Sequence, residues 1–72
     1  MADVLELQRR VDARMEAFMT GRKKTTRAEF GAELTEDLAY EASHISPAPS
    51  DDERRYVRDF IESKYASKLV NF

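Results

Sequence analysis

The sequence contains no cysteine, only one histidine and only two glycines among its 72 residues. Without cysteine, the chain can form neither a disulfide nor a thiolate nucleophile, and it cannot build a zinc site on cysteine ligands. The single histidine, His44, has no second histidine with which to share a metal and no recognisable nucleophile beside it. Two isolated glycines do not make a phosphate-binding loop. We therefore expect a protein that is not an enzyme and that uses no metal and no cofactor.

Long apolar runs are also missing, since uninterrupted apolar stretches extend over only a few residues. A transmembrane helix needs about 20 such residues, so no membrane association is predicted. The first residues, Met-Ala-Asp-Val-Leu-Glu, lack the basic start and the apolar run of a signal peptide. Together with the absence of cysteine, these features predict a cytoplasmic protein. The length predicts a single domain, residues 1–72, with a small core.

Charge is plentiful, but its two signs are segregated along the chain. Residues 29–53 carry eight carboxylates and neither lysine nor arginine. The flanking segments, 1–28 and 54–72, each carry three more basic than acidic side chains. The formal net charge of −2 therefore conceals an acidic centre between two basic ends.

Periodic apolar residues predict an all-α fold, a small three-helix bundle with helices at about residues 3–20, 27–42 and 51–68. A residue suited to N-capping stands at the start of each helix: Asp3, Thr26 and Ser50. A glutamate three positions later completes a capping box in two cases, Thr26 with Glu29 and Ser50 with Glu53. Gly21 should end the first helix. Pro47 and Pro49 end the second helix and make residues 43–50 a semi-rigid linker before the third. The short first connector favours antiparallel neighbours.

The apolar faces predict the core, and two residues interrupt the face of the second helix. The expected core residues are Leu7, Val11, Met15, Phe18, Phe30, Leu34, Leu38, Val57, Phe60, Ile61 and Tyr65. Gly31 costs about 1 kcal/mol relative to alanine within a helix, which indicates either close approach of another helix or a weak point. Glu41 falls in the middle of the apolar face, where a buried carboxylate needs a partner. We expect the helix to fray near residues 39–41, with an ion pair to an arginine of another helix as the alternative.

The carboxylates of the second helix predict a surface for a protein partner. Its members are Glu29, Glu33, Glu36, Asp37 and Glu41. An acidic helix face steers a molecule toward a basic surface, so we expect a small adaptor or inhibitor that binds such a protein through this face and through exposed aromatic residues. The competing interpretation is that the carboxylates pair internally with the basic ends. The apolar segment 69–72 either packs on the bundle or contacts a partner, and a homodimer is compatible with both.

A second function class, a nucleic-acid-associated regulator, rests on the basic residues of the first helix and the following loop. These are Arg9, Arg10, Arg14, Arg22, Lys23, Lys24 and Arg27. Such a strip can neutralise phosphates. The stretch Thr-Arg-Ala-Glu-Phe-Gly-Ala-Glu-Leu, residues 26–34, is similar to the first helix of the helix-turn-helix in phage-type repressors. The resemblance implies a recognition helix at 37–44, but that segment has two carboxylates and no Lys or Arg, so phosphate would repel it.

Overall fold

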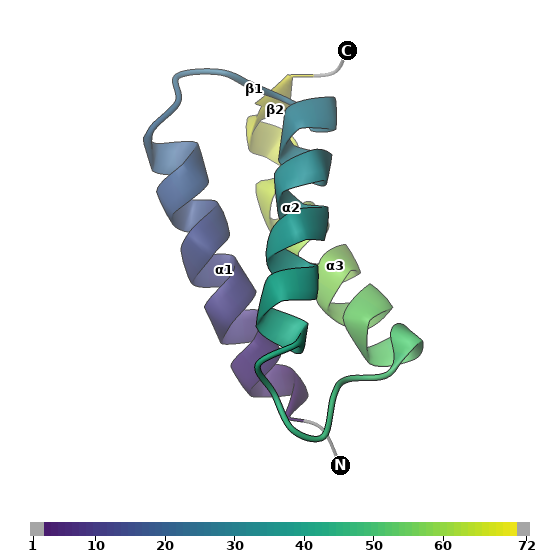
Figure 1. Ribbon diagram of the computed structural model, residues 1–72. Helices are drawn as coiled ribbons and strands as arrows, with labels where there is room; N and C mark the ends of the chain where they lie inside the picture. The colour runs from purple at the N-terminus through teal and green to yellow at the C-terminus, as the bar shows by residue number, and fades with distance from the viewer. Residues whose placement is uncertain (1–2, 71–72) are drawn as a thin grey trace.

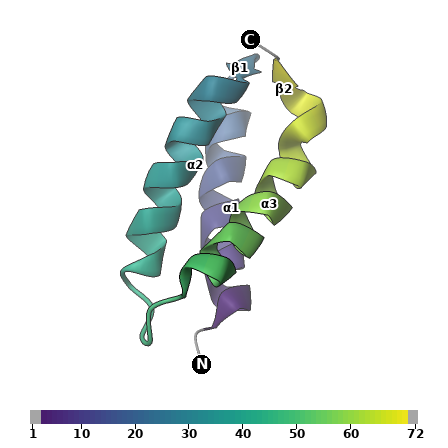
Figure 2. The same cartoon turned by 90° about the vertical axis from the view of Figure 1, so that its right-hand side faces the viewer.

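A computed structural model describes residues 3–70, which form three α-helices and two very short strands. The elements in chain order are α1 (Val4–Thr20), β1 (Thr25–Thr26), α2 (Arg27–Ala42), α3 (Asp51–Tyr65), the 3-10 turn η1 (Ala66–Lys68) and β2 (Leu69–Val70). This confirms the predicted three-helix bundle. Helices α1 and α2 lie antiparallel, and α3 crosses them and runs in the same direction as α1 (Figures 1 and 2).

The predicted capping residues begin all three helices. The carboxylate of Asp3 accepts a hydrogen bond from the Glu6 amide at 3.0 Å. Thr26 and Glu29 exchange both hydrogen bonds of a capping box at the start of α2, and Ser50 and Glu53 do the same at the start of α3. Because these side chains satisfy amides that have no partner within the helix, the helix starts are fixed by residues only three positions apart.

The end of the third helix differs from the prediction, because α3 stops at Tyr65 rather than at residue 68. After Tyr65 the chain forms the 3-10 turn η1 and then the strand β2, which pairs in parallel with β1. Thr25 lies opposite Leu69, and Thr26 lies opposite Val70. Three of these four residues are β-branched, which suits extended backbone. The apolar segment thus packs on the bundle as far as Val70, and its last two residues lie outside the described range.

The core confirms most of the predicted residues and corrects one. Phe30 is 1% exposed. The centre of its ring lies 6.5 Å from the centre of the Phe18 ring and 5.6 Å from that of the Tyr65 ring, and both pairs of rings are tilted. Phe18 is only partly buried but packs on the core. Phe60 was expected in the core and is 41% exposed, so that expectation is wrong. The reason is geometric: α3 has neighbours on one side only, and the narrow stripe of Val57, Ile61 and Tyr65 fills that side.

Two further features concern α2 and the linker. A β-carbon built on Gly31 would meet nothing within 4 Å, so the interpretation of this glycine as a point of close helix approach is wrong. Beyond the end of α2, the linker residue Ile45 is buried at 8% exposure and joins the core together with Ala42. The linker therefore packs against the bundle before it turns toward α3.

Candidate interaction surfaces

Two carboxylates of α2 are buried against α1. Asp37 and Glu41 are 6% and 8% exposed, and α2 continues as a regular helix through both. The expectation that the helix frays near residues 39–41 is therefore wrong. The alternative, an ion pair to an arginine of another helix, describes the structure: Oδ1 of Asp37 lies 3.0 Å from Nε of Arg14. Oε1 of Glu41 lies 3.6 Å from Nη1 of Arg10.

These two ion pairs follow the antiparallel register of α1 and α2. Arg10 and Arg14 are one turn apart on α1, and their partners Glu41 and Asp37 are one turn apart on α2 in the opposite order. The pKa of Arg14 is raised, chiefly by its contact with Asp37. The pKa of Arg10 is raised chiefly by Glu6, 2.9 Å away, and to a smaller extent by Glu41. The two pairs form a charged seam, defined as Arg10, Arg14, Asp37 and Glu41, that fits only one alignment of the helices.

Of the other three carboxylates of α2, one forms hydrogen bonds and an ion pair, and two form no ion pair within the described residues. Glu29 completes the capping box and lies 2.7 Å from Arg22. Its pKa is lowered from the ordinary value of 4.5, first by hydrogen bonds from Thr26 and then by Arg22. Glu33 and Glu36 form no ion pair within residues 3–70. The acidic face is therefore not continuous, because Asp37 and Glu41 are buried in the seam, while Glu29, Glu33 and Glu36 stay outside it.

The predicted basic strip is also divided. Arg10 and Arg14 belong to the seam, and the guanidinium of Arg22 lies 4.6 Å from the centre of the Phe18 ring while it pairs with Glu29. The remaining members are exposed and form no ion pair within the described part of the chain: Arg9, Lys23, Lys24 and Arg27. The resemblance to a helix-turn-helix does not extend to the fold, because α2 runs without a turn from Arg27 to Ala42.

Sequence reasoning missed an exposed aromatic pair on α3. Tyr56 is 59% exposed and Phe60 is 41% exposed, and their spacing of four residues places them on one face of the helix. Asp52 and Asp59 are exposed and border the same face at helical spacing. We call these four residues the α3 outer face. The signal in the sequence is the helical spacing, since at about 100° per residue Phe60 lies about 100° and Tyr56 about 140° from Ile61, outside the buried stripe.

Among residues 3–70, Tyr40 is a third exposed aromatic residue, and its ring contacts neighbouring side chains. Its ring lies 4.4 Å from the ring of His44 and 5.0 Å from the guanidinium carbon of Arg14. The imidazole Nδ1 of His44 lies 2.7 Å from the carbonyl oxygen of Tyr40. These contacts place Tyr40 beside the seam of α1 and α2, on a different helix from the α3 outer face.

Neither membrane insertion nor metal binding is indicated by the described residues. Within residues 3–70, every helix is too short or too polar to cross a bilayer. The same residues bring together no group of three or more histidine and carboxylate side chains that could hold a metal ion. Comparison with models of known families, with curated proteins and with solved structures finds no match. Function is therefore inferred from the surfaces.

Proposed function

We propose that the protein is a non-enzymatic adaptor or inhibitor that binds a protein partner through the α3 outer face. The observation that carries this proposal is the exposure of Tyr56 and Phe60 one helical turn apart. Aromatic side chains are enriched at the centres of protein interfaces, where their burial dominates the binding energy. The opposite side of α3 is fixed in the core by Val57, Ile61 and Tyr65, so the exposed face is held rigidly before binding.

The charges around the aromatic pair favour a partner with a basic rim. Asp59 forms no ion pair within residues 3–70, and the only pair of Asp52 is a 3.7 Å contact with the exposed Arg55. A helix that presents aromatic anchors at positions i and i+4 suits an apolar groove, and flanking carboxylates suit lysines or arginines at the edge of that groove. The acidic partner-binding surface is thereby relocated from α2 to α3, while the chemistry of the expected partner is retained.

The test compares two sets of exposed aromatic residues. The wild-type chain, the double variant Tyr56→Ala with Phe60→Ala, and the control variant Tyr40→Ala are immobilised and exposed to an extract of the native host. We expect a protein that is retained by the wild type and by the control but lost from the double variant. With that protein purified, truncation of two anchor residues should weaken its Kd by about 30-fold or more, which corresponds to about 2 kcal/mol.

Circular dichroism provides the folding control, since both variants alter exposed side chains and should keep the helix content of the wild type. Equal retention of every captured protein by the wild type and the folded double variant would overturn the proposal. Sedimentation of the chain alone then tests whether the chain associates with a second copy of itself. Self-association that is abolished by the double variant would identify a second copy as the occupant of this face and would also overturn the adaptor function. Charge reversal of Glu33 and Glu36 should leave the partner bound, because these residues lie on α2.

A further inference from the structure

Exposed apolar side chains are unevenly distributed over the bundle. Four large ones are exposed within residues 3–70: Leu5 at 68%, Tyr40 at 52%, Tyr56 at 59% and Phe60 at 41%. Tyr40 lies beside the seam of α1 and α2, whereas the other three belong to α1 and α3. A single exposed leucine needs no explanation, but a cluster of exposed apolar side chains marks an interaction surface. The position of Leu5 relative to the aromatic pair therefore matters.

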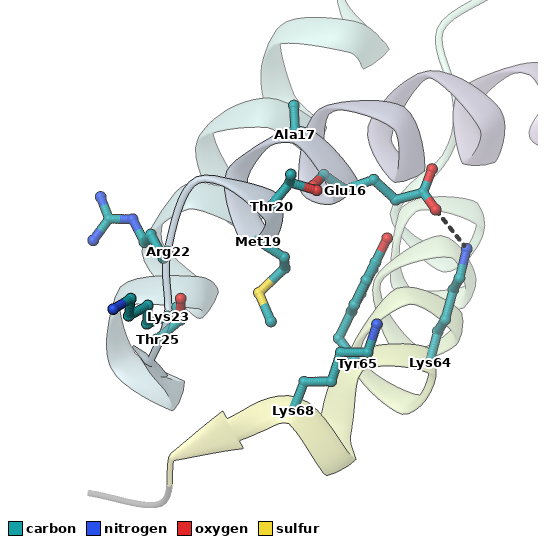
Figure 3. A pocket seen from close by; sticks show the side chains of 10 residues that line it. All are labelled: Glu16, Ala17, Met19, Thr20, Arg22, Lys23, Thr25, Lys64, Tyr65 and Lys68. Carbon is teal, nitrogen blue, oxygen red and sulfur yellow. Dashed lines mark hydrogen bonds and ion pairs between the residues drawn. The ribbon is translucent and has the colours of Figure 1, made fainter.

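Contacts near the end of α3 fix its register against α1. Figure 3 shows this end of the bundle, where a pocket of about 770 Å³ lies between the loop after α1 and η1 and where Lys64 points toward Glu16. Nζ of Lys64 lies 2.8 Å from Oδ2 of Asp12 and 3.8 Å from Oε1 of Glu16. The hydroxyl of Tyr65 donates a hydrogen bond to Oδ1 of Asp12 at 3.1 Å. Asp12 and Lys64 therefore lie at the same level of the two helices.

Counting back from this contact places Leu5 beside the aromatic pair. Leu5 precedes Asp12 by seven residues, about two helical turns, so both side chains lie on the side of α1 that meets α3. Phe60 precedes Lys64 by about one turn, and Tyr56 precedes it by about two. Because α1 and α3 run in the same direction, both counts lead to the same end of the bundle (Figure 2). We call Leu5, Tyr56 and Phe60 the α1–α3 strip.

The two borders of the α1–α3 strip carry opposite charges. Arg9 follows Leu5 by about one turn on α1, is exposed and forms no ion pair within residues 3–70. Asp59 borders the aromatic pair on α3 and is also exposed and unpaired within that range. A partner whose groove has a basic rim on every side would bring a cation toward Arg9. Like charges brought together at an interface weaken binding and select against such a partner.

We propose that the partner contacts α1 and α3 together, with Leu5 as a third apolar anchor beside Tyr56 and Phe60. The partner is a protein whose apolar groove has a rim of mixed charge, with lysine or arginine facing Asp59 and aspartate or glutamate facing Arg9. This inference rests on the proposed function, because it adds residues to the same binding surface. It also fixes the orientation of the partner, since the reverse orientation would place like charges together.

The apolar part is tested on the purified protein that the wild type retains and the Tyr56→Ala, Phe60→Ala double variant loses. Leu5→Ala should weaken the Kd for this protein by at least about fivefold, as expected for an anchor residue. Tyr40→Ala, which truncates an exposed side chain on the other side of the bundle, should change it by less than about twofold. Amide shifts at residues 5–9 should accompany binding, and circular dichroism should show the wild-type helix content in both variants.

The charged part is tested by changing the sign of one residue at a time. Arg9→Glu should weaken the Kd by at least about fivefold, whereas Arg9→Lys, which keeps the charge, should stay within about twofold of the wild type. Asp59→Lys should also weaken it. Lys24→Glu is the matched control, because Lys24 is an exposed cation without an ion pair in the described chain but lies in the loop after α1. Tighter binding by Arg9→Glu would show that the facing rim is basic and would overturn the proposal.

The outcomes separate this inference from the proposed function. Full affinity of folded Leu5→Ala and Arg9→Glu, with the partner still lost from the double variant, would overturn the inference and leave the proposed function standing. Absence of any protein that distinguishes the wild type from the double variant would overturn both. A second copy of the chain is the competing occupant, since Arg9 of one copy could pair with Asp59 of another. Self-association that Arg9→Glu abolishes and Arg9→Glu with Asp59→Arg restores would overturn the proposal in favour of that second copy.

Discussion

Replacing Glu41 with leucine should stabilise the protein, although it removes an ion pair. Glu41 occupies the apolar face of α2 and is 8% exposed, and its nearest cation is Arg10 at 3.6 Å. Arg10 also has a closer partner, Glu6, at 2.9 Å. Loss of the Glu41 carboxylate therefore leaves no buried charge without a partner, which is the usual reason why breaking a buried ion pair is destabilising.

The magnitude follows from burial. A buried leucine side chain contributes about 1.5–3 kcal/mol relative to an exposed one. The lost contact with the largely solvated Arg10 offsets a small part of this gain, since ion pairs with exposed arginines contribute little. Leucine and glutamate have similar helix propensities, so the substitution hardly changes the intrinsic stability of the helix. Because the methylene groups of Glu41 are already buried, only part of the leucine contribution is gained, and we expect the free energy of unfolding to rise by about 1 kcal/mol, which corresponds to about 4–8 °C in Tm for a domain of this size.

Urea and thermal unfolding followed by circular dichroism measure this change, with Glu36→Leu as the control. Glu36 is on the same helix but is exposed, so its replacement should not raise the stability. If Glu41→Leu lowers the Tm while Glu36→Leu does not, the carboxylate contributes more than a single long contact with Arg10. The reasoning that Glu41 stabilises the protein only weakly through Arg10 would then be wrong.

Four further substitutions test the packing by urea unfolding. Phe30→Ala should lower the free energy of unfolding by about 3–5 kcal/mol and largely unfold the chain. Phe60→Ala changes an exposed site and should lower it by less than about 1 kcal/mol. Equal losses in the two variants would contradict the assigned core. Gly31→Ala should raise it by up to about 1 kcal/mol, because nothing lies within 4 Å of the added β-carbon, and a decrease would reveal a close contact at this position. Thr25 is 1% exposed and its hydroxyl has no hydrogen-bond partner among the described residues, so Thr25→Val should raise the free energy of unfolding by about 1 kcal/mol; a decrease would show that the hydroxyl has a partner.

The helix positions could be predicted from the sequence because their determinants are local. The capping boxes of α2 and α3 join residues three positions apart, and Pro47 sets a limit beyond which α2 cannot continue, although the helix already ends at Ala42. The end of α3 could not be predicted in the same way. Residues 66–70 leave the helix to pair with Thr25 and Thr26, and no local pattern in residues 51–68 contains that interaction.

The positions of individual side chains depended on tertiary neighbours. Periodicity identified Glu41 as an unusual residue in an apolar face, but only the register of α1 against α2 supplies Arg10 as its partner. Phe60 was placed in the core because a helical wheel does not show how wide a stripe the neighbouring helices cover. The pocket between the loop after α1 and η1 could not be predicted either, since its lining residues, such as Thr25 and Lys68, come together only in the fold.

The footprint of a bound protein partner tests the central functional claim most directly. Amide chemical shifts of the isotope-labelled chain are recorded with and without the partner captured by the wild type. The relocation of the binding surface to α3 predicts the largest changes at residues 52–60, centred on Tyr56 and Phe60. Changes centred on Glu33 and Glu36 of α2, with residues 52–60 unaffected, would contradict it.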